Sequence, residues 1–338
     1  MLGTQLYAPG DVRIEEMPEP TLQKPTDVTI RLAATCVCGS DLWPYRGLNK
    51  FERPMHMGHE YCGTVVEVGS AVTSVKPGQF VVGSFCLSDN TCPHCRYGFQ
   101  SSCVQREFMT GAQSQFARVP LADGTLIALD QQPDDDLIPS LLAASDVLGT
   151  GWYAAVAARV EPGCTAVVVG DGAVGLMGVL AARQLGAARV ITMSRHKARQ
   201  ELALDYGATD IVAERGDDGV AKVKALTDQI GADAVLECVG TNESMQQALA
   251  IARPGSMIGY VGVPHGVQFD GGRLFYSQTG MLGGPAPVRR FLPKLIDLIL
   301  TRQINPGKVF DLQLPLADVA EGYKAMDERR AIKALLRV

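Results

Sequence analysis

Residues 165–175 read Thr165-Ala166-Val167-Val168-Val169-Gly170-Asp171-Gly172-Ala173-Val174-Gly175, and this stretch decides the fold. Its first half is a run of small and β-branched apolar residues, which predicts a strand buried on both faces. Its second half has three glycines at the G-x-G-x-x-G spacing and opens a helical pattern that continues to Leu185. A glycine turn between a buried strand and a helix predicts a dinucleotide-binding unit, with the pyrophosphate at the helix N-terminus.

Residues of the glycine motif are those that we expect to contact the dinucleotide. The alternative interpretation, a glycine-rich turn without a ligand, is disfavoured because the motif follows a strand without a gap and opens a helix. The predicted contacts are Gly170, Gly172, Ala173, Val174 and Gly175.

Downstream of this stretch, apolar strands alternate with helical segments. Residues 188–193, 232–239 and 256–261 are typical of strands, and residues 197–206 are typical of a helix. Such alternation predicts a parallel, doubly wound α/β sheet. From Pro287 onward the sequence predicts a helix at 291–301 and then a polar tail, which we expect to pack back onto the first domain.

Upstream of this stretch the sequence has a different pattern. Short β-branched segments bounded by glycine or proline occur at 27–32, 63–68 and 79–82, and they predict strands of an all-β barrel or sandwich. A chain of 338 residues is long enough for two domains. The sequence therefore predicts one domain from 1–147 with 286–338, and a second domain from 148–285.

Composition excludes several classes of protein. The formal net charge is −5, and no cluster of lysine and arginine suggests binding to nucleic acid. The N-terminus has no basic segment leading into an apolar run, so we expect no signal peptide. The most apolar stretch, near 174–182, is shorter than the ~20 residues of a membrane span. We therefore expect a cytoplasmic protein that binds neither nucleic acid nor membrane.

The end of the second strand of the sheet indicates which dinucleotide binds. An NAD site usually has an acid about 20 residues after the glycine motif, yet no Asp or Glu occurs from Ile191 to Gln200. Ser194 followed by Arg195 suits a 2′-phosphate, because a guanidinium is always charged and binds phosphate bidentately. An acid at this position would repel the 2′-phosphate, and none is present in this segment. We predict NADP over NAD, with Arg195 as the main contact and Ser194 and Lys197 beside it; the alternative is a solvated basic helix start.

Candidate metal ligands lie in the first domain. Cys38 and His59 offer a thiolate and an imidazole, which suit zinc but do not by themselves make a site. Asp146 lies in an apolar stretch of small residues, where an unpaired carboxylate would be costly. Four of the nine cysteines crowd into 86–103, and in a cytosolic protein such clusters favour metal ligands over disulfides.

Residues 58–63 match the pattern G-H-E-x-x-G and continue to Val68-Gly69, which resembles the zinc-dehydrogenase signature of the medium-chain dehydrogenase/reductase family. The order of the parts is also similar, and the resemblance covers nearly the whole chain. It implies an α/β fold with a GroES-like β-barrel catalytic domain and a Rossmann doubly wound parallel-sheet domain. It implies a zinc-dependent alcohol dehydrogenase that transfers a hydride between an alcohol or polyol, or the matching aldehyde or ketone, and NAD(P); the residues at the end of the second strand favour NADP.

The resemblance also implies the ligands of a catalytic zinc. These are Cys38, His59 and Asp146, with Glu60 nearby as an exchangeable ligand or as a partner of a ligand. Many members of the family have cysteine where this chain has Asp146, and others carry an acid. The exchange keeps two anionic ligands, so the charge of the metal site is unchanged.

Residues around these ligands receive roles by the same resemblance. Ser40 matches the hydroxyl that carries the proton away from the alcohol, although a helix N-cap is the alternative. Thr150 matches the position beside the nicotinamide. Asp41 is expected, on chemical grounds, to orient His59 rather than to react. Trp43 stands where the family often has a histidine that ends the proton relay. An indole only donates, so the relay runs through ribose and water or is shortened.

A second cluster resembles the structural-zinc lobe of the family. Its register is Asp89-x2-Cys92-x2-Cys95-x7-Cys103, with Asp89 in place of the first cysteine. A carboxylate can ligate zinc, and Cys86 or His94 could substitute if the loop bends. The alternative is a lobe without metal.

Two other functions are weighed against the alcohol dehydrogenase. One is a zinc-free NADPH-dependent quinone or enone reductase with the same domains. Such reductases lack zinc ligands, so the presence of Cys38, His59 and Asp146 counts against this function. The other is a non-catalytic NADP-binding redox sensor, which the ligand set also disfavours because a sensor needs no open zinc position. The expected partner is a small alcohol or carbonyl substrate, whose pocket could include Trp43, Tyr45 and either Phe275 or Tyr276. The resemblance favours a homodimer or homotetramer formed through residues 257–261 and 281–283.

Overall fold

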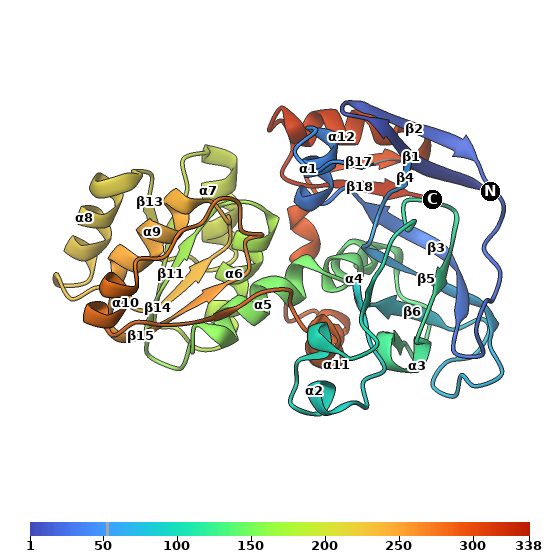
Figure 1. Cartoon of the computed structure of the whole chain (residues 1–338), viewed down its shortest axis with the longest axis horizontal. Coiled ribbons are helices and arrows are strands. Elements are labelled where there is room, and N and C mark those ends of the chain that lie inside the picture. Colours follow the sequence, from blue (N-terminus) through green and yellow to red (C-terminus); the bar gives the residue numbers. More distant parts are fainter. Residues whose placement is uncertain (52–53) are drawn as a thin grey trace. The chain divides into compact units, whose positions relative to one another are not determined.

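The computed structural model describes residues 1–51 and 54–338, and it divides into two compact units. The first unit comprises Met1–Gly149 and Pro287–Val338, and the second comprises Thr150–Ala286 (Figure 1). The chain therefore leaves the first unit once and returns to it. Each unit has buried apolar clusters of its own, so each has the core that an independent domain requires.

Within the described residues, the main sheet of the first unit has seven strands. Its strands follow the order β10-β6-β5-β3-β18-β17, and β9 pairs with β3 outside this order. Strands β3, β5 and β6 confirm the strands predicted at 27–32, 63–68 and 79–82. The bounds are β3 (Val28–Cys36), β5 (Tyr61–Val68), β6 (Phe80–Gly83), β9 (Phe116–Val119), β10 (Leu126–Ala128), β17 (Leu312–Pro315) and β18 (Ala334–Arg337).

Smaller elements complete the N-terminal part of this unit. A separate sheet has the order β2-β1-β4, and β7 pairs with β8. The prediction that this part is all-β is wrong, because helices also occur in it. The longest is α4 (Ile138–Ala144), where Leu and Ala residues favour a helix and Pro139 suits its first turn. The other bounds are β1 (Leu2–Ala8), β2 (Asp11–Glu16), β4 (Met55–His56), β7 (Cys86–Leu87), β8 (Glu107–Phe108), α1 (Leu42–Tyr45), α2 (Pro93–Arg96) and α3 (Ala122–Thr125).

The C-terminal segment returns to the first unit as predicted, but it is not a polar tail. After the predicted helix, α11 (Val288–Leu300), the chain forms β17, α12 (Val319–Asp327) and β18. Strand β18 lies between β3 and β17 in the main sheet, and it pairs antiparallel with β3 through Leu335 opposite Cys36. An interior strand is covered on both faces, which is why residues 334–336 are fully buried.

The second unit is a doubly wound Rossmann domain. Its six strands are all parallel in the order β13-β12-β11-β14-β15-β16, with helices between them (Figure 1). The bounds are β11 (Thr165–Val169), α6 (Ala173–Gln184), β12 (Arg189–Met193), α7 (Lys197–Asp205), β13 (Asp210–Val212), α8 (Gly216–Leu226), β14 (Ala232–Glu237), α9 (Asn242–Ile251), β15 (Ala252–Tyr260), α10 (Gly271–Ser277) and β16 (Gly280–Gly283).

The strands that the sequence predicts in this unit are confirmed, whereas β13, α8 and α9 were not predicted. One helix, α5 (Val147–Ala157), contains the boundary between the two units. Within 1–51 and 54–338, no helix combines the length and apolar character that a membrane crossing needs.

Candidate metal centre and dinucleotide site

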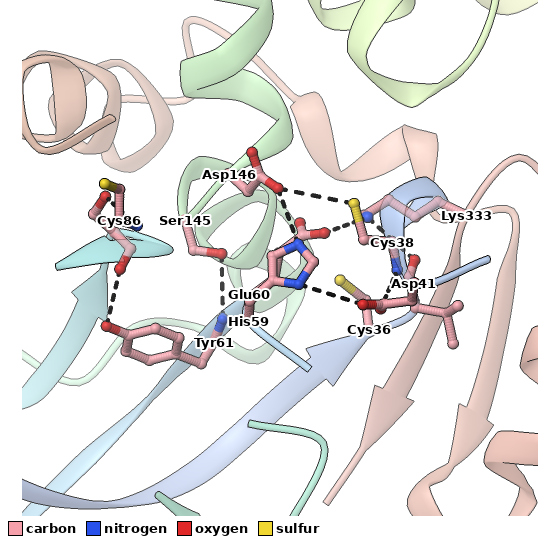
Figure 2. A network of polar contacts seen from close by, with 12 residues as sticks. Cys36, Cys38, Asp41, His59, Glu60, Tyr61, Cys86, Ser145, Asp146 and Lys333 are labelled. Atoms are coloured by element: carbon pink, nitrogen blue, oxygen red, sulfur yellow. Dashed lines mark hydrogen bonds and ion pairs between the residues drawn. The ribbon is translucent and has the colours of Figure 1, made fainter. Parts of the chain in front are cut away.

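Four candidate ligands from distant parts of the sequence meet in the first unit. Cys38 follows β3, whereas His59 and Glu60 directly precede β5. Strands β3 and β5 are antiparallel neighbours, so the end of one meets the start of the other. Asp146 lies between α4 and α5. Ligand atoms of all four residues lie within 4.8 Å of one another (Figure 2).

Asp146 contacts two of these residues through the same carboxylate oxygen. Its Oδ2 is 3.3 Å from Nε2 of His59 and 3.8 Å from Sγ of Cys38. The other ring nitrogen of His59, Nδ1, is 3.4 Å from Oδ1 of Asp41. One edge of the imidazole therefore meets the cluster, while Asp41 contacts the opposite edge of the ring.

A buried network supports the turn that contains Cys38. Oδ2 of Asp41 accepts hydrogen bonds from the backbone N–H of Cys38 at 2.9 Å and from Nε2 of Gln113 at 3.2 Å. Oε1 of Gln113 in turn accepts from Oη of Tyr323 at 3.0 Å. All of these polar groups are buried, and each hydrogen bond restricts the position of the next. Gln113 and Tyr323 were not predicted, because no local pattern marks them.

A glycine places His59. Gly58 has a φ of +97°, and a Cβ there would lie 2.3 Å from the backbone nitrogen of Gln113. Its backbone oxygen accepts from the N–H of Ala112, so the two segments pack backbone to backbone. Only glycine fits both the left-handed conformation and the close approach.

Lys333 lies behind the cluster. Its Nζ is 2.6 Å from Oε1 of Glu60 and also donates to the backbone oxygen of Val37 at 3.2 Å (Figure 2). The side chains of Lys333 and Glu60 are 1% and 0% exposed. Lys333 was not predicted, although the sequence contains a signal for it. This lysine interrupts the apolar run 331–336, and a buried ammonium requires a partner.

The donor set fits a bound cation. Burial raises the pKa of the Cys38 thiol and that of Glu60, although Lys333 opposes both shifts. Burial alone would lower the pKa of His59, but Asp41, Cys38 and Asp146 raise it well above its ordinary range. Oε2 of Glu60 is buried and has no hydrogen-bond partner. Sulfur, nitrogen and oxygen donors in one buried cluster are those that zinc prefers.

Ser40 and Trp43 lie on the segment that follows Cys38. Ser40 is an exposed residue of the 3₁₀ turn Gly39–Asp41, whose N-cap is Cys38, so the N-cap alternative for Ser40 is wrong. Trp43 is half-buried in α1. Thr150 is buried in α5 of the second unit.

An aromatic side chain that was not predicted from the sequence borders the cluster. The ring of Phe85 packs edge-on against His59, with centroids 6.1 Å apart, and stacks on Phe108 at 6.2 Å. Of the aromatic residues suggested for a pocket, Tyr45 packs on Tyr323 at 5.3 Å. Phe275 and Tyr276 are both exposed in the second unit. Phe85 is therefore an aromatic residue in contact with a candidate ligand.

The second cluster also assembles in the first unit. Sγ of Cys92 is 3.5 Å from Sγ of Cys95 and 3.9 Å from Sγ of Cys103. Oδ1 of Asp89 is 3.5 Å from Sγ of Cys95. These four residues form a group that could bind a metal ion, whereas Cys86 and His94 are not members of it. All nine cysteines are free thiols.

The charge of Asp89 is stabilised locally. Its Oδ1 accepts from the backbone N–H groups of Thr91 at 2.8 Å and Cys92 at 3.0 Å, and its Oδ2 accepts from Gln105 at 3.1 Å. Burial opposes ionisation, but the backbone donors hold the pKa of Asp89 well below its usual range. Asp89 is therefore an anionic donor in the position where the resemblance places a cysteine.

In the second unit, the glycine turn joins β11 to α6. Gly170 has a φ of +120°, and a Cβ on Gly175 would lie 2.1 Å from the backbone oxygen of Gly170. Both positions therefore require glycine. Gly172 is the N-cap of α6, which begins at Ala173, so the N–H groups of its first turn are available to an anion.

The end of β12 differs from the prediction in one respect. Ser194 is fully buried, and its hydroxyl donates to Oδ2 of Asp171 at 2.8 Å. Arg195 and Lys197 are exposed. No acid lies on the chain from Ile191 to Gln200, but the glycine turn brings one, Asp171, to the end of this strand. Parallel pairing of β11 with β12 brings Asp171, which follows β11, to the end of β12.

Together these features define a class of protein. A barrel with a buried cluster of Cys38, His59, Glu60 and Asp146, in one chain with a Rossmann domain, is the architecture of a metal-dependent dehydrogenase.

Comparisons with known proteins agree. Residues 24–130 match the alcohol dehydrogenase GroES-like domain, and residues 173–300 match the zinc-binding dehydrogenase domain. Zinc-type alcohol dehydrogenase B of Aspergillus flavus is 31% identical over 350 residues, covering 100% of this chain and 81% of that protein. Sorbitol dehydrogenase of Bacillus subtilis is 31% identical over 275 residues, covering 78% and 75%. The solved alcohol dehydrogenase TADH from Thermus sp. ATN1 has a TM-score of 0.92 at 30% identity, covering 100% of both chains.

The chain belongs to the zinc-dependent alcohol dehydrogenases of the medium-chain dehydrogenase/reductase family. This agrees with the resemblance inferred from the sequence, and it makes the protein an NAD(P)-dependent oxidoreductase.

Proposed function

We propose that the protein transfers a hydride between an alcohol or polyol, or the matching aldehyde or ketone, and a nicotinamide dinucleotide at the cluster around His59. The observation that carries this proposal is the meeting of Cys38, His59 and Asp146 within ligand distance of one another. Three donors leave one place for substrate in a four-coordinate zinc site.

We propose a separate role for each residue of the cluster. Zinc, when bound by Cys38, His59 and Asp146, supplies a Lewis acid for the substrate oxygen. Asp41 contacts Nδ1 of His59 at 3.4 Å and thereby keeps Nε2 directed at the cluster. Glu60 is paired with Lys333 at one oxygen, while its second oxygen is buried without a hydrogen-bond partner. It suits the role of an exchangeable ligand.

Ser40 is proposed to accept the proton that leaves the alcohol, and Thr150 to lie beside the nicotinamide. We expect Ser40→Ala to lower kcat by about 10²-fold, the usual contribution of a positioned proton carrier. Ser40→Thr, which keeps the hydroxyl, should retain most of the activity. The measurement is steady-state kinetics of alcohol oxidation across pH. Equal activity of the alanine and threonine variants would show that the hydroxyl carries no proton.

We also propose that Asp89, Cys92, Cys95 and Cys103 bind a structural zinc. Three thiols and an ionised carboxylate within 4.8 Å support this proposal. A metal there would connect the start and the end of the segment 89–103, which has only short helices of its own. Structural zinc contributes directly to folding in small metal-bound lobes.

Metal content and coenzyme-dependent turnover, measured together, test these proposals. We expect about two zinc ions per chain and oxidation of small alcohols that stops when a chelator removes the metal. Cys95→Ser should lose about one zinc ion per chain and thermal stability while the remaining protein keeps its turnover number. Turnover by protein that contains only one zinc ion per chain would contradict the proposal of a structural zinc. NADPH oxidation by quinones that survives Cys38→Ala would favour a zinc-free reductase, and zinc binding without turnover would favour a redox sensor.

We propose NADP as the preferred dinucleotide. Arg195 and Lys197 are exposed at the end of β12, where a Rossmann domain binds the adenosine ribose. Arg199 and Arg215 add positive charge nearby, since both stabilise the ionised form of Asp171. Guanidinium groups bind a 2′-phosphate well.

We further propose a cytoplasmic homodimer or homotetramer that binds neither nucleic acid nor membrane. Nine free thiols suit a reducing compartment. Strand β16 ends the six-stranded sheet, so it suits an interface formed by β15 and β16.

A further inference from the structure

We propose that Asp171 limits the preference for NADP and keeps NAD usable as a second coenzyme. This inference rests on the proposed dinucleotide site and concerns a residue for which the sequence predicted no role. Asp171 lies between Gly170 and Gly172 in the turn that approaches the pyrophosphate, and its side chain is 13% exposed.

Sheet pairing places Asp171 at the end of the neighbouring strand. Strands β11 and β12 are parallel, with Val169 opposite Met193. The two residues that leave the sheet after them, Gly170 and Ser194, are therefore adjacent, and the carboxylate of Asp171 lies within hydrogen-bond distance of Ser194. Because the adenosine ribose binds at this end of a Rossmann sheet, Asp171 lies where an acid on β12 would lie in an NAD site.

The hydrogen bond between these residues changes what Ser194 can offer. A serine hydroxyl has one hydrogen to donate, and Ser194 donates it to Oδ2 of Asp171 at 2.8 Å. A phosphate oxygen needs a donor, so the Ser194 hydroxyl cannot donate to a 2′-phosphate while this bond persists. A ribose 2′-hydroxyl is itself a donor, and the Asp171 carboxylate accepts from it.

The charge of Asp171 acts in the same direction. Although burial opposes ionisation, the hydrogen bond from Ser194 and the positive charges of Arg199 and Arg215 lower the pKa of Asp171. The carboxylate is therefore an anion within the basic group that should attract the phosphate. Its Oδ1 is 3.4 Å from Nη1 of Arg199, so part of that positive charge is already neutralised.

Dissociation constants of NADPH and NADH, measured by nucleotide fluorescence on the full chain without substrate, test the role of Asp171. Asp171→Asn should bind NADPH about tenfold more tightly, since a like charge near the phosphate is removed, and NADH with unchanged or lower affinity. Asp171→Ser should shift the ratio of the NADPH and NADH dissociation constants in the same direction. This second variant shows that the effect does not depend on asparagine itself. An unchanged ratio, or weaker NADPH binding in both variants, would overturn the proposal.

Ser194→Ala provides a second test. In the natural background it should weaken NADPH binding much less than in a background without the Asp171 carboxylate, because the hydroxyl already donates to Asp171. In the Asp171→Ala background, where no acceptor remains on this side chain and the hydroxyl is free to reach the phosphate, it should weaken NADPH binding several-fold. The same loss in both backgrounds would contradict the proposal.

Asp233→Asn is the matched control. Asp233 is also paired with an arginine, Arg253, at 2.7 Å and accepts from the N–H of Thr165 at 2.8 Å. It lies on β14 beside the first residue of β11, at the opposite end of the sheet from Asp171. It should leave the ratio of the two affinities unchanged. If neither nucleotide binds the natural protein, the proposed dinucleotide function fails; if both bind and only the ratio is insensitive to Asp171, this inference alone fails.

Discussion

Asp146→Asn is expected to lower kcat/KM for alcohol oxidation by about 10³-fold or more, equivalent to about 4 kcal/mol of transition-state stabilisation. Asparagine keeps the shape of the side chain but removes the negative charge that lies 3.3 Å from His59 Nε2 and 3.8 Å from Cys38 Sγ. A site with one anionic ligand fewer binds a divalent cation more weakly. The measurement is steady-state kinetics together with zinc content determined on the same preparation.

Asp146→Cys is the control for this prediction. A thiolate restores the anion and is itself a zinc ligand, so this variant should retain zinc and a substantial part of the activity. Loss of activity in both variants, with zinc retained in both, would mean that Asp146 acts in another way than as a ligand. Full activity of Asp146→Asn would exclude it from the reaction.

Lys333→Met is expected to lower the free energy of unfolding of the first unit by about 3–5 kcal/mol, the usual cost of removing one member of a buried ion pair. Glu60 would keep a buried carboxylate whose partner at 2.6 Å is gone. Thermal and denaturant unfolding of metal-free protein measure the effect, because bound zinc would add its own contribution to stability.

The double variant Lys333→Met with Glu60→Gln should recover most of the lost stability, since no unpaired charge then remains buried. Lys24→Met is the matched surface control. Its partner Glu107 is 3.8 Å away, and both side chains are about half exposed, so its effect should stay within about 0.5 kcal/mol. A loss in Lys333→Met as small as that of the control would mean that the pair contributes little.

Much of the fold was predictable because its signals are local. The apolar run Thr165–Val169 and the glycines that follow it specify a strand, a turn and a helix within a short stretch, and the structure confirms all three. The same holds for β3, β5 and β6. Helix α4 was missed because a short buried helix without a polar face has no periodic pattern that separates it from a strand.

The candidate site was predictable only where a motif marks its members. Cys38, His59 and Asp146 stand in recognisable stretches, and the structure brings their side chains together. Lys333 and Tyr323 reach the same site from the C-terminal segment through the pairing of β18 with β3 and the packing of α12. Such long-range contacts leave no spacing in the sequence from which to infer them.

Asp171 illustrates a different limit. It lies inside the glycine motif, whereas the acid of an NAD site is expected at the end of the next strand. Sequence distance proved misleading, because parallel neighbours bring the residues after β11 and β12 to one edge. A chemical function can thus be supplied from either strand of such a pair.

The interior position of β18 has a consequence for synthesis on the ribosome. Strand β3 pairs with β18, and Glu60 pairs with Lys333, although the whole Rossmann domain is encoded between them. The first domain therefore cannot complete its main sheet, and Glu60 cannot pair with Lys333, until the ribosome has translated the Rossmann domain and the segment after it. That half has its own core and contiguous sequence, so it can fold first. During synthesis, the chain should consequently become able to bind the dinucleotide before it becomes able to bind the metal ion.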